Sequence, residues 1–150
     1  MADYVATVEW HSDGGFREGR YSRAHKLSFD GGAVVPGSSS PHVVPEPMSD
    51  PAGVDPEEAL VASASACHML WFLHVAREAG LDVAAYRDEA LGTMGKDERG
   101  RMAMTRIVLR PEIEFAGDAP GAEALEQLHH EAHERCFIAN SLRTEIVVES

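Results

Sequence analysis

Alternating and helical patterns of apolar side chains divide the chain into a series of strands interrupted by two helices. Stretches rich in β-branched and aromatic residues are expected to be strands, and the Gly-, Asp- and Ser-rich segments between them are expected to be turns. The expected strands cover 4–10, 21–29, 33–35, 90–94, 102–109, 112–115 and 143–148, with 83–87 leading into the fourth. Helices are expected over 56–79 and 122–135. This order of elements predicts one α+β domain spanning residues 1–150.

The first helix has a clear beginning and an uncharged middle. Asp55 is a good N-cap, Pro56 suits the first helical position, and Glu58 completes a capping box, while Gly80 is expected to end the helix. Between Glu58 and Arg77 there is no Asp, Glu, Lys or Arg. A helix that is apolar around its whole circumference is expected to be buried on all sides. Because one sheet and one amphipathic helix hardly cover such a helix, we predict an obligate homodimer in which the central helices of two chains pack together.

Residues 36–53 form a long irregular stretch that contains five prolines. Connections of this length inside a domain are often lids or binding loops. A tolerated insertion explains the stretch equally well, so both interpretations stay open.

Composition and charge narrow the class of function. Hydrophobic residues make up 44% of the chain, which is typical of a folded protein, and the formal net charge of -12 disfavours nucleic acid and anionic lipid as partners. Neither an N-terminal targeting signal nor an uninterrupted apolar run of about 18 residues is visible, so we expect a soluble cytoplasmic protein without a membrane span. Two cysteines in that reducing compartment are poor candidates for a permanent disulfide. They are either inert core residues or a redox pair.

The two cysteines, Cys67 and Cys136, carry the clearest potential chemistry. A buried cysteine is most often a small apolar side chain, whereas a reactive one must ionise and needs a cation or a helix terminus nearby. Cys67 lies about 17 Å from the start of its helix at roughly 1.5 Å per residue, so the helix dipole helps little. A guanidinium is therefore required, and the arginines that precede Cys67 are Arg17, Arg20 and Arg23.

Two segments resemble the OsmC/Ohr family, the osmotically inducible and organic-hydroperoxide-resistance proteins. Residues 55–68 read DPEEALVASASACH and contain the family's Pro-Glu, an aliphatic and alanine run, and Ala-Cys. Residues 132–141 read AHERCFIANS and contain its second Cys, followed by a Ser-containing turn into the last strand. The order of elements also agrees, so the resemblance covers nearly the whole chain. It implies an OsmC-like intertwined dimer with antiparallel and mixed sheets around long buried central helices.

The resemblance also implies a thiol-dependent peroxidase that reduces organic hydroperoxides. Cys67 would attack the peroxide, and Cys136 would resolve the resulting sulfenic acid. Glu57 matches the family's acidic position, and the site arginine comes from the N-terminal strands. Spacing favours Arg23 for that role, with Arg20 second. No bound cofactor is expected, because an external dithiol, of lipoyl type by resemblance, would reduce the disulfide.

The spacing of Glu57 and Cys67 adds a geometric constraint. Ten residues of straight helix separate them by roughly 15 Å along the axis, so they cannot share one site within a chain. If two central helices pack antiparallel, Glu57 of one chain approaches Cys67 of the other. We therefore hypothesise a composite site at the dimer interface.

Several alternatives depend on other residues. His129 and His133 lie four apart near Cys136 and Glu126, which invites a metal site, although solvated surface histidines explain the pattern as well. His68 lies about 100° round the helix from the preceding cysteine and is expected to be a satisfied buried histidine. The chain could also be a non-catalytic binding protein for an apolar small molecule at the dimer interface, or act by thiol chemistry on another substrate.

Overall fold

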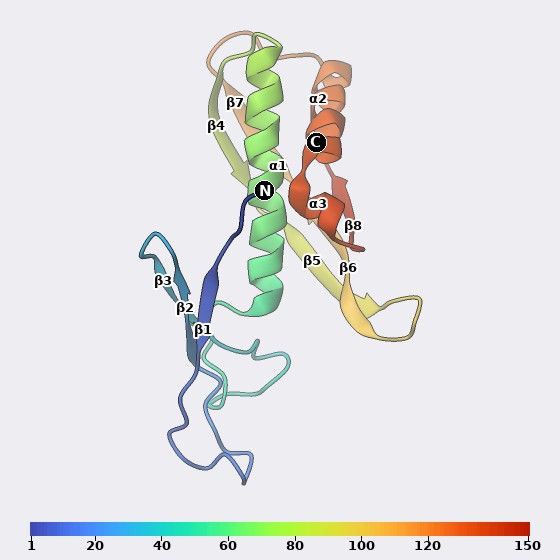
Figure 1. Ribbon diagram of the computed structural model, residues 1–150. Coiled ribbons are helices and arrows are strands. Elements are labelled where there is room, and N and C mark those ends of the chain that lie inside the picture. Colours follow the sequence, from blue (N-terminus) through green and yellow to red (C-terminus); the bar gives the residue numbers. More distant parts are fainter. The chain divides into compact units, whose positions relative to one another are not determined.

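Eight strands and three helices follow one another along the chain, which confirms the α+β class (Figure 1). The computed structural model describes all residues, 1–150, in two compact units, Met1–Ala59 and Leu60–Ser150. The first unit contains β1 (Ala6–Glu9), β2 (His25–Phe29), β3 (Val34–Gly37) and the start of α1 (Pro56–Glu78). The second contains the rest of α1, β4 (Val83–Asp88), β5 (Leu91–Lys96), β6 (Met102–Leu109), β7 (Pro111–Phe115), α2 (Ala122–Arg135), α3 (Phe137–Ser141) and β8 (Glu145–Val148).

The first unit is built on the antiparallel sheet β1-β2-β3, in which Val8 pairs with Leu27 and Leu27 with Val35. Strand β2 begins at residue 25, four residues later than the pattern predicts. The preceding backbone is used elsewhere, because Arg23 N donates to Met48 O at 2.8 Å and Trp10 Nε1 donates to Ser22 O at 2.8 Å. Backbone groups that hydrogen-bond to a loop carbonyl and to a side chain are not available to pair with a neighbouring strand, so β2 starts later.

The proline-containing stretch after β3 has no regular element and is held by local hydrogen bonds. Asp50 N donates to the buried Ser38 Oγ at 2.8 Å, and an isolated parallel bridge joins Gly37 to Val54. The stretch ends at the capping box that the sequence predicts. Asp55 N donates to Glu58 Oε1 at 2.9 Å, and Glu58 N donates to Asp55 Oδ1 at 2.8 Å.

Helix α1 ends as expected at Gly80, whose φ of 81° is accessible mainly to glycine. Gly80 N donates to Arg77 O and Leu81 N donates to Ala76 O, each at 3.0 Å. This pattern satisfies carbonyls that the end of the helix leaves free. The chain then turns directly into β4.

In the second unit, α1 contributes to two apolar cores. Its C-terminal half packs through Phe72 and Val75 against α2 and the β4–β7 pair, and Figure 1 shows α2 running beside this half. Further towards its N-terminus, Ala64 packs against Ile107 and Leu109 of β6. Strand β6 is the central strand of the mixed sheet β5-β6-β8, antiparallel to β5 and parallel to β8.

Burial of α1 on all sides, expected from its composition, is not found within one chain. Its buried residues form one stripe, namely Ala64, His68, Phe72, Val75 and Ala76. On another face Ala62, Ser63 and Ala66 are exposed, and Leu70 is 63% exposed. The sheets and α2 of the second unit cover a single stripe of the helix and leave an apolar face of α1 uncovered by that unit.

Judged by length and composition, α1 is also the one helix that qualifies as a membrane span, and 28% of its most apolar window is buried. The sequence expectation of no span rested on the lack of an uninterrupted apolar run, since serine and histidine side chains interrupt it. The core helix of a soluble protein meets the same criteria. The buried stripe of α1 supplies residues to both apolar cores, which accounts for part of its apolar composition.

Candidate functional site: a thiol pair and an aromatic pocket

Cys136 lies at the junction between α2 and α3 and is 1% exposed. Its extended backbone, with φ -68° and ψ 111°, ends α2 and starts α3. Its Sγ accepts a hydrogen bond from Ala139 N at 3.4 Å, so the sulfur serves as the N-cap of α3. The sequence analysis expected a turn at Asn140 and Ser141 and missed α3, because a five-residue helix depends on this cap more than on any apolar pattern.

Cys67 lies in the middle of α1, half-buried, and neighbours Cys136. Both are free thiols. Burial raises the pKa of the Cys136 thiol, the Ala139 backbone N–H opposes this, and interaction with the Cys67 side chain raises the pKa again. The structure thus brings together two thiols that are 69 residues apart in the sequence, and it favours the protonated form of the buried one.

The difference in exposure gives the two sulfurs different chemical possibilities. The more accessible Cys67 is the one that an incoming molecule reaches, whereas Cys136 is screened by α3 and its surroundings. A protonated thiol next to a reactive one is suited to condense with an oxidised sulfur and release water.

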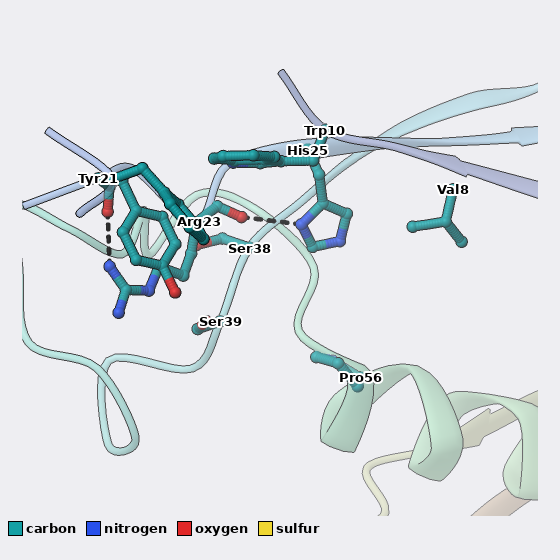
Figure 2. Close-up of a pocket in the computed structure, with 9 residues that line it drawn as sticks. Val8, Trp10, Tyr21, Arg23, His25, Ser38, Ser39 and Pro56 are labelled. Atoms are coloured by element: carbon teal, nitrogen blue, oxygen red, sulfur yellow. Dashed lines mark hydrogen bonds between the residues drawn. The ribbon is translucent and has the colours of Figure 1, made fainter. Parts of the chain in front are cut away.

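A pocket of about 270 Å³ lies in the first unit (Figure 2). Three of its walls are aromatic rings packed on each other, with centroid distances of 5.8 Å for Trp10–Phe16, 5.7 Å for Trp10–Tyr21 and 4.9 Å for Phe16–Tyr21. Its full lining is Val8, Trp10, Phe16, Tyr21, Arg23, His25, Ser38, Ser39 and Pro56. The residues come from β1, β2, the loop between them, the stretch after β3 and the start of α1.

Two side chains supply most of the polar chemistry of this pocket. The Arg23 guanidinium carbon lies 3.5 Å from the centroid of the Tyr21 ring, and Arg23 Nη1 donates to Tyr21 O at 2.6 Å. His25 Nδ1 donates a hydrogen bond to Arg23 O at 2.8 Å. In Figure 2 the other ring nitrogen, Nε2, is on the opposite edge of the imidazole.

The arginines and the glutamate that the sequence singles out have different surroundings. Arg17 and Arg20 are exposed, whereas Arg23 is half-buried in the pocket wall. Glu57 lies in the first turn of α1, and its Oε2 is buried without a partner. Within one chain no ion pair within 4.0 Å involves Arg23, and the role of Glu57 in the site stays a prediction. Arg23 belongs to the first unit and Cys67 to the second, so a role of Arg23 at the thiol stays a prediction.

A pair of buried imidazoles joins α1 to α2 in the second unit. His68 Nε2 lies 3.0 Å from His129 Nδ1, and the rings are nearly parallel at 12° with centroids 5.3 Å apart. Burial, together with the neighbouring His129 and His133, lowers the pKa of His68 to about 4, and burial lowers the pKa of His129 to about 4. His68 Nδ1 and His129 Nε2 have no partner. The expectation of a buried His68 is confirmed, but only one of its two nitrogens is satisfied.

The metal site considered around His129, His133 and Cys136 does not correspond to the arrangement of these side chains. His129 is turned towards His68, and Cys136 towards Cys67 and α3. No group of three or more His, Cys, Asp or Glu side chains is arranged to hold a metal ion.

The family model of the OsmC-like proteins matches residues 49–150, a segment that contains both cysteines and most of the fold. This chain belongs to the OsmC-like family. The resemblance drawn from the two cysteine-containing segments is therefore confirmed. A search of curated proteins found no match.

Solved structures agree with the OsmC-like assignment over the whole chain. An OsmC-like protein of unknown function from Vibrio cholerae is 48% identical, with a TM-score of 0.96 and 99% of each chain covered. An organic hydroperoxide resistance protein OsmC from Legionella pneumophila is 16% identical, with a TM-score of 0.70 and full coverage of both chains. An organic hydroperoxide resistance protein from Elizabethkingia anophelis is 18% identical, with a TM-score of 0.72 over 100% of this chain and 97% of that one. The last two show the fold alone.

Sequence reasoning missed the aromatic pocket of this OsmC-like protein. Its rings come from Trp10, Phe16 and Tyr21, which lie on both sides of a glycine turn that was assigned only as a connection. These aromatic residues are irregularly spaced, so no helical or strand period in the sequence indicates that they form a pocket. The one available signal is their density, since three of the ten aromatic residues of the chain lie within twelve positions.

Proposed function

We propose that this chain is a thiol-dependent peroxidase that reduces organic hydroperoxides, with Cys67 as the attacking thiolate and Cys136 as its resolving partner. The observation that carries the proposal is the neighbouring pair of free thiols, one half-buried and one buried, in an OsmC-like fold. The names of the hydroperoxide resistance proteins with this fold are consistent with the substrate class.

The reaction proceeds in three balanced steps. The Cys67 thiolate attacks the distal peroxide oxygen, the O–O bond breaks, and the alkoxide leaves and takes up a proton to become an alcohol. The sulfenic acid on Cys67 then condenses with the Cys136 thiol, whose proton leaves with the hydroxyl as water, and a disulfide forms. An external dithiol reduces this disulfide by exchange and is itself oxidised to a cyclic disulfide.

A cation is needed to favour the Cys67 thiolate and the departing alkoxide, and Arg23 is our candidate. It is half-buried and free of acidic partners, whereas Arg17 and Arg20 are exposed. Glu57, whose buried Oε2 has no partner, remains the proposed acidic residue of the site, supplied across a dimer interface.

The open apolar face of α1 supports the homodimer that this composite site requires. A second copy of the chain would cover that face, which includes the 63% exposed Leu70. Leu70→Asp is expected to convert a dimer to a monomer in sedimentation analysis, and a monomeric wild type would contradict the proposed interface.

We place the protein in the cytoplasm, where reductants keep both thiols reduced.

Peroxide consumption tests the proposed function. Wild-type protein with dihydrolipoamide or dithiothreitol should consume many equivalents of cumene hydroperoxide, and each equivalent should oxidise one equivalent of dithiol. The same assay with the dithiol omitted should stop after about one equivalent per chain, since the disulfide is not reduced. Consumption no faster than in a protein-free control would remove the assignment.

A further inference from the structure

One aromatic ring of α1 contacts both sequence neighbours of Cys136. The Trp71 ring meets the Phe137 ring edge to face, with centroids 5.4 Å apart and planes at 83°. The Arg135 guanidinium carbon lies 5.7 Å from the centroid of the same Trp71 ring. Trp71 follows Cys67 by four residues, so their side chains share one face of α1. Both contacts therefore lie about one helical turn from the place where the two sulfurs meet.

We propose that the Trp71 cluster, defined as Trp71 with Phe137 and Arg135, positions the resolving thiol for disulfide formation. The cluster holds the junction between α2 and α3 against α1, so that the Cys136 sulfur stays beside that of Cys67. This inference deepens the proposed function, in which Cys136 resolves the Cys67 sulfenic acid. No side chain of the cluster exchanges protons or electrons in that step. They act by fixing where the second sulfur lies.

Hydrogen bonds fix Cys136 within its own segment but not against α1. Cys136 N donates to His133 O at 3.2 Å, and Cys136 O accepts from Asn140 N at 3.0 Å. Its sulfur accepts from Ala139 N at 3.4 Å. These bonds join the residue to α2 and α3, which Figure 1 shows beside α1. Packing must therefore set the distance between the sulfurs. The Trp71 cluster supplies that packing next to Cys136, and Ile138 adds contacts to the core below α3.

The exposure of the cluster indicates a role other than burial. Phe137 is 67% exposed, and Arg135 is exposed as well. A ring that keeps most of its surface in solvent gains little from the hydrophobic effect. Arg135 is itself held over the Trp71 ring, because it pairs with Glu131 at 2.7 Å and with Glu78 at 3.4 Å. Two exposed side chains that converge on one ring restrain the residue between them.

Disulfide formation is sensitive to such a restraint. The bond requires two sulfurs at about 2.05 Å with a dihedral angle near roughly 90°, so a small displacement of one backbone prevents it. Well-placed groups react at effective concentrations far above those of free thiols, and a shift of about 1 Å removes much of this advantage. A second peroxide molecule competes for the sulfenic acid and converts it to sulfinic acid. The cluster should therefore determine how much oxidised Cys67 ends as disulfide.

Equilibrium with glutathione tests the cluster without any peroxide. Oxidised glutathione takes two electrons and two protons from the Cys67 and Cys136 thiols, so one protein disulfide and two reduced glutathione molecules form. Phe137→Ala should lower the equilibrium constant of this exchange by about tenfold or more, and Arg135→Gln by about threefold. Alkylation and mass spectrometry measure the reduced, mixed and intramolecular forms. A protein that fails the peroxidase assay still gives a result in this experiment.

Two control variants separate positioning from general packing. His74→Ala removes the other edge contact of the Trp71 ring, at 5.5 Å and 88°, and leaves the contacts next to Cys136 in place. Phe137→Tyr keeps the aromatic edge. Both variants should retain the wild-type equilibrium constant within about twofold. A loss in His74→Ala as large as that in Phe137→Ala would overturn the proposal.

Reaction with cumene hydroperoxide gives a second readout that a purely structural role would not change. Phe137→Ala should leave the rate of sulfenic acid formation within about twofold of wild type, because Cys67 stays on α1. The same variant should reach the Cys67 sulfinic acid at about tenfold lower peroxide. An unchanged glutathione equilibrium in Phe137→Ala, or a wild type that forms no Cys67–Cys136 disulfide, would overturn the proposal. If circular dichroism shows that Phe137→Ala is unfolded, Phe137→Leu takes its place under the same criteria.

Discussion

Two polar pairs connect α1 to the segment that follows β7, and they begin at adjacent residues of the helix. Cys67 meets Cys136, and His68 meets His129. The sulfur pair has one half-buried member, whereas the imidazoles are 1% and 4% exposed. Since the two side chains on α1 diverge by about 100°, one pair lies where a molecule can approach it and the other is enclosed by the core.

The comparison teaches that residue type alone does not identify the reactive pair. Histidine is the commoner general acid or base, but these two imidazoles bond to each other, and both have lowered pKa values. The His129 ring also stacks on the core residue Phe72. The thiols are weaker hydrogen-bonding groups, and one of them is accessible. The proposed chemistry therefore rests on the sulfurs, and the imidazoles are expected to have a structural role.

The largest expected effect separates the adjacent residues Cys67 and His68. Cys67→Ser should lower kcat/KM for cumene hydroperoxide by about 10³-fold or more, because no thiolate remains to attack. His68→Gln, which retains a hydrogen-bonding group towards His129, should stay within about tenfold of wild type if circular dichroism shows a folded protein. Comparable losses in both variants would break the distinction between the pairs.

A second change sharpens the roles within the sulfur pair. Cys136→Ser should consume about one equivalent of peroxide rapidly and further peroxide only slowly, through overoxidation, since no thiol is present to resolve the sulfenic acid. Mass spectrometry should find Cys67 progressing to the sulfinic acid as more peroxide is added. Sustained turnover by this variant with a dithiol present would show that Cys136 is not needed as the resolving residue.

Substitutions in the imidazole pair should lower the free energy of unfolding. Replacing one partner, as in His129→Leu, leaves the other buried and unsatisfied and should cost about 1–3 kcal/mol of unfolding free energy in urea. The double variant His68→Leu/His129→Leu should cost less than the sum of the single changes. Strict additivity in this double-mutant cycle would mean that the hydrogen bond between the rings contributes nothing.

Lowering the pH should reduce the free energy of unfolding through the same histidine pair, with a smaller effect than the substitutions. The pKa of each histidine falls from 6.5 to about 4 on folding, so the unfolded chain binds more protons between these values. Stability is therefore complete above about pH 6.5 and is lost as the pH falls towards 4. Between about pH 7.5 and pH 6 the loss should be on the order of 1 kcal/mol per histidine. Urea titrations of the double leucine variant should show a flatter dependence, and an identical slope in both proteins would exclude these histidines as its source.

Local sequence patterns predicted the regular elements well. Asp55 and Glu58 form the capping box read from their spacing, and the helix and strand limits at 122–135 and 102–109 agree with α2 and β6. These features depend on neighbours within a few residues, which the sequence displays directly.

Contacts between distant residues were not accessible in the same way. The His68–His129 bond spans 61 positions, and nothing in the local pattern marks it. The role of Cys136 was named only through a family resemblance. The exposed face of α1 shows another limit of sequence reasoning. Its composition predicts that the helix is buried, but it does not say whether the same chain or a second chain buries it.

The most direct test of the account is the oxidation product formed with one equivalent of cumene hydroperoxide. Reduced protein would be treated, quenched with an alkylating agent and digested without reductant. We predict a single peptide pair joined by a Cys67–Cys136 disulfide within one chain. A Cys67 sulfinic acid without that disulfide, a link between two chains, or two unmodified thiols would contradict it.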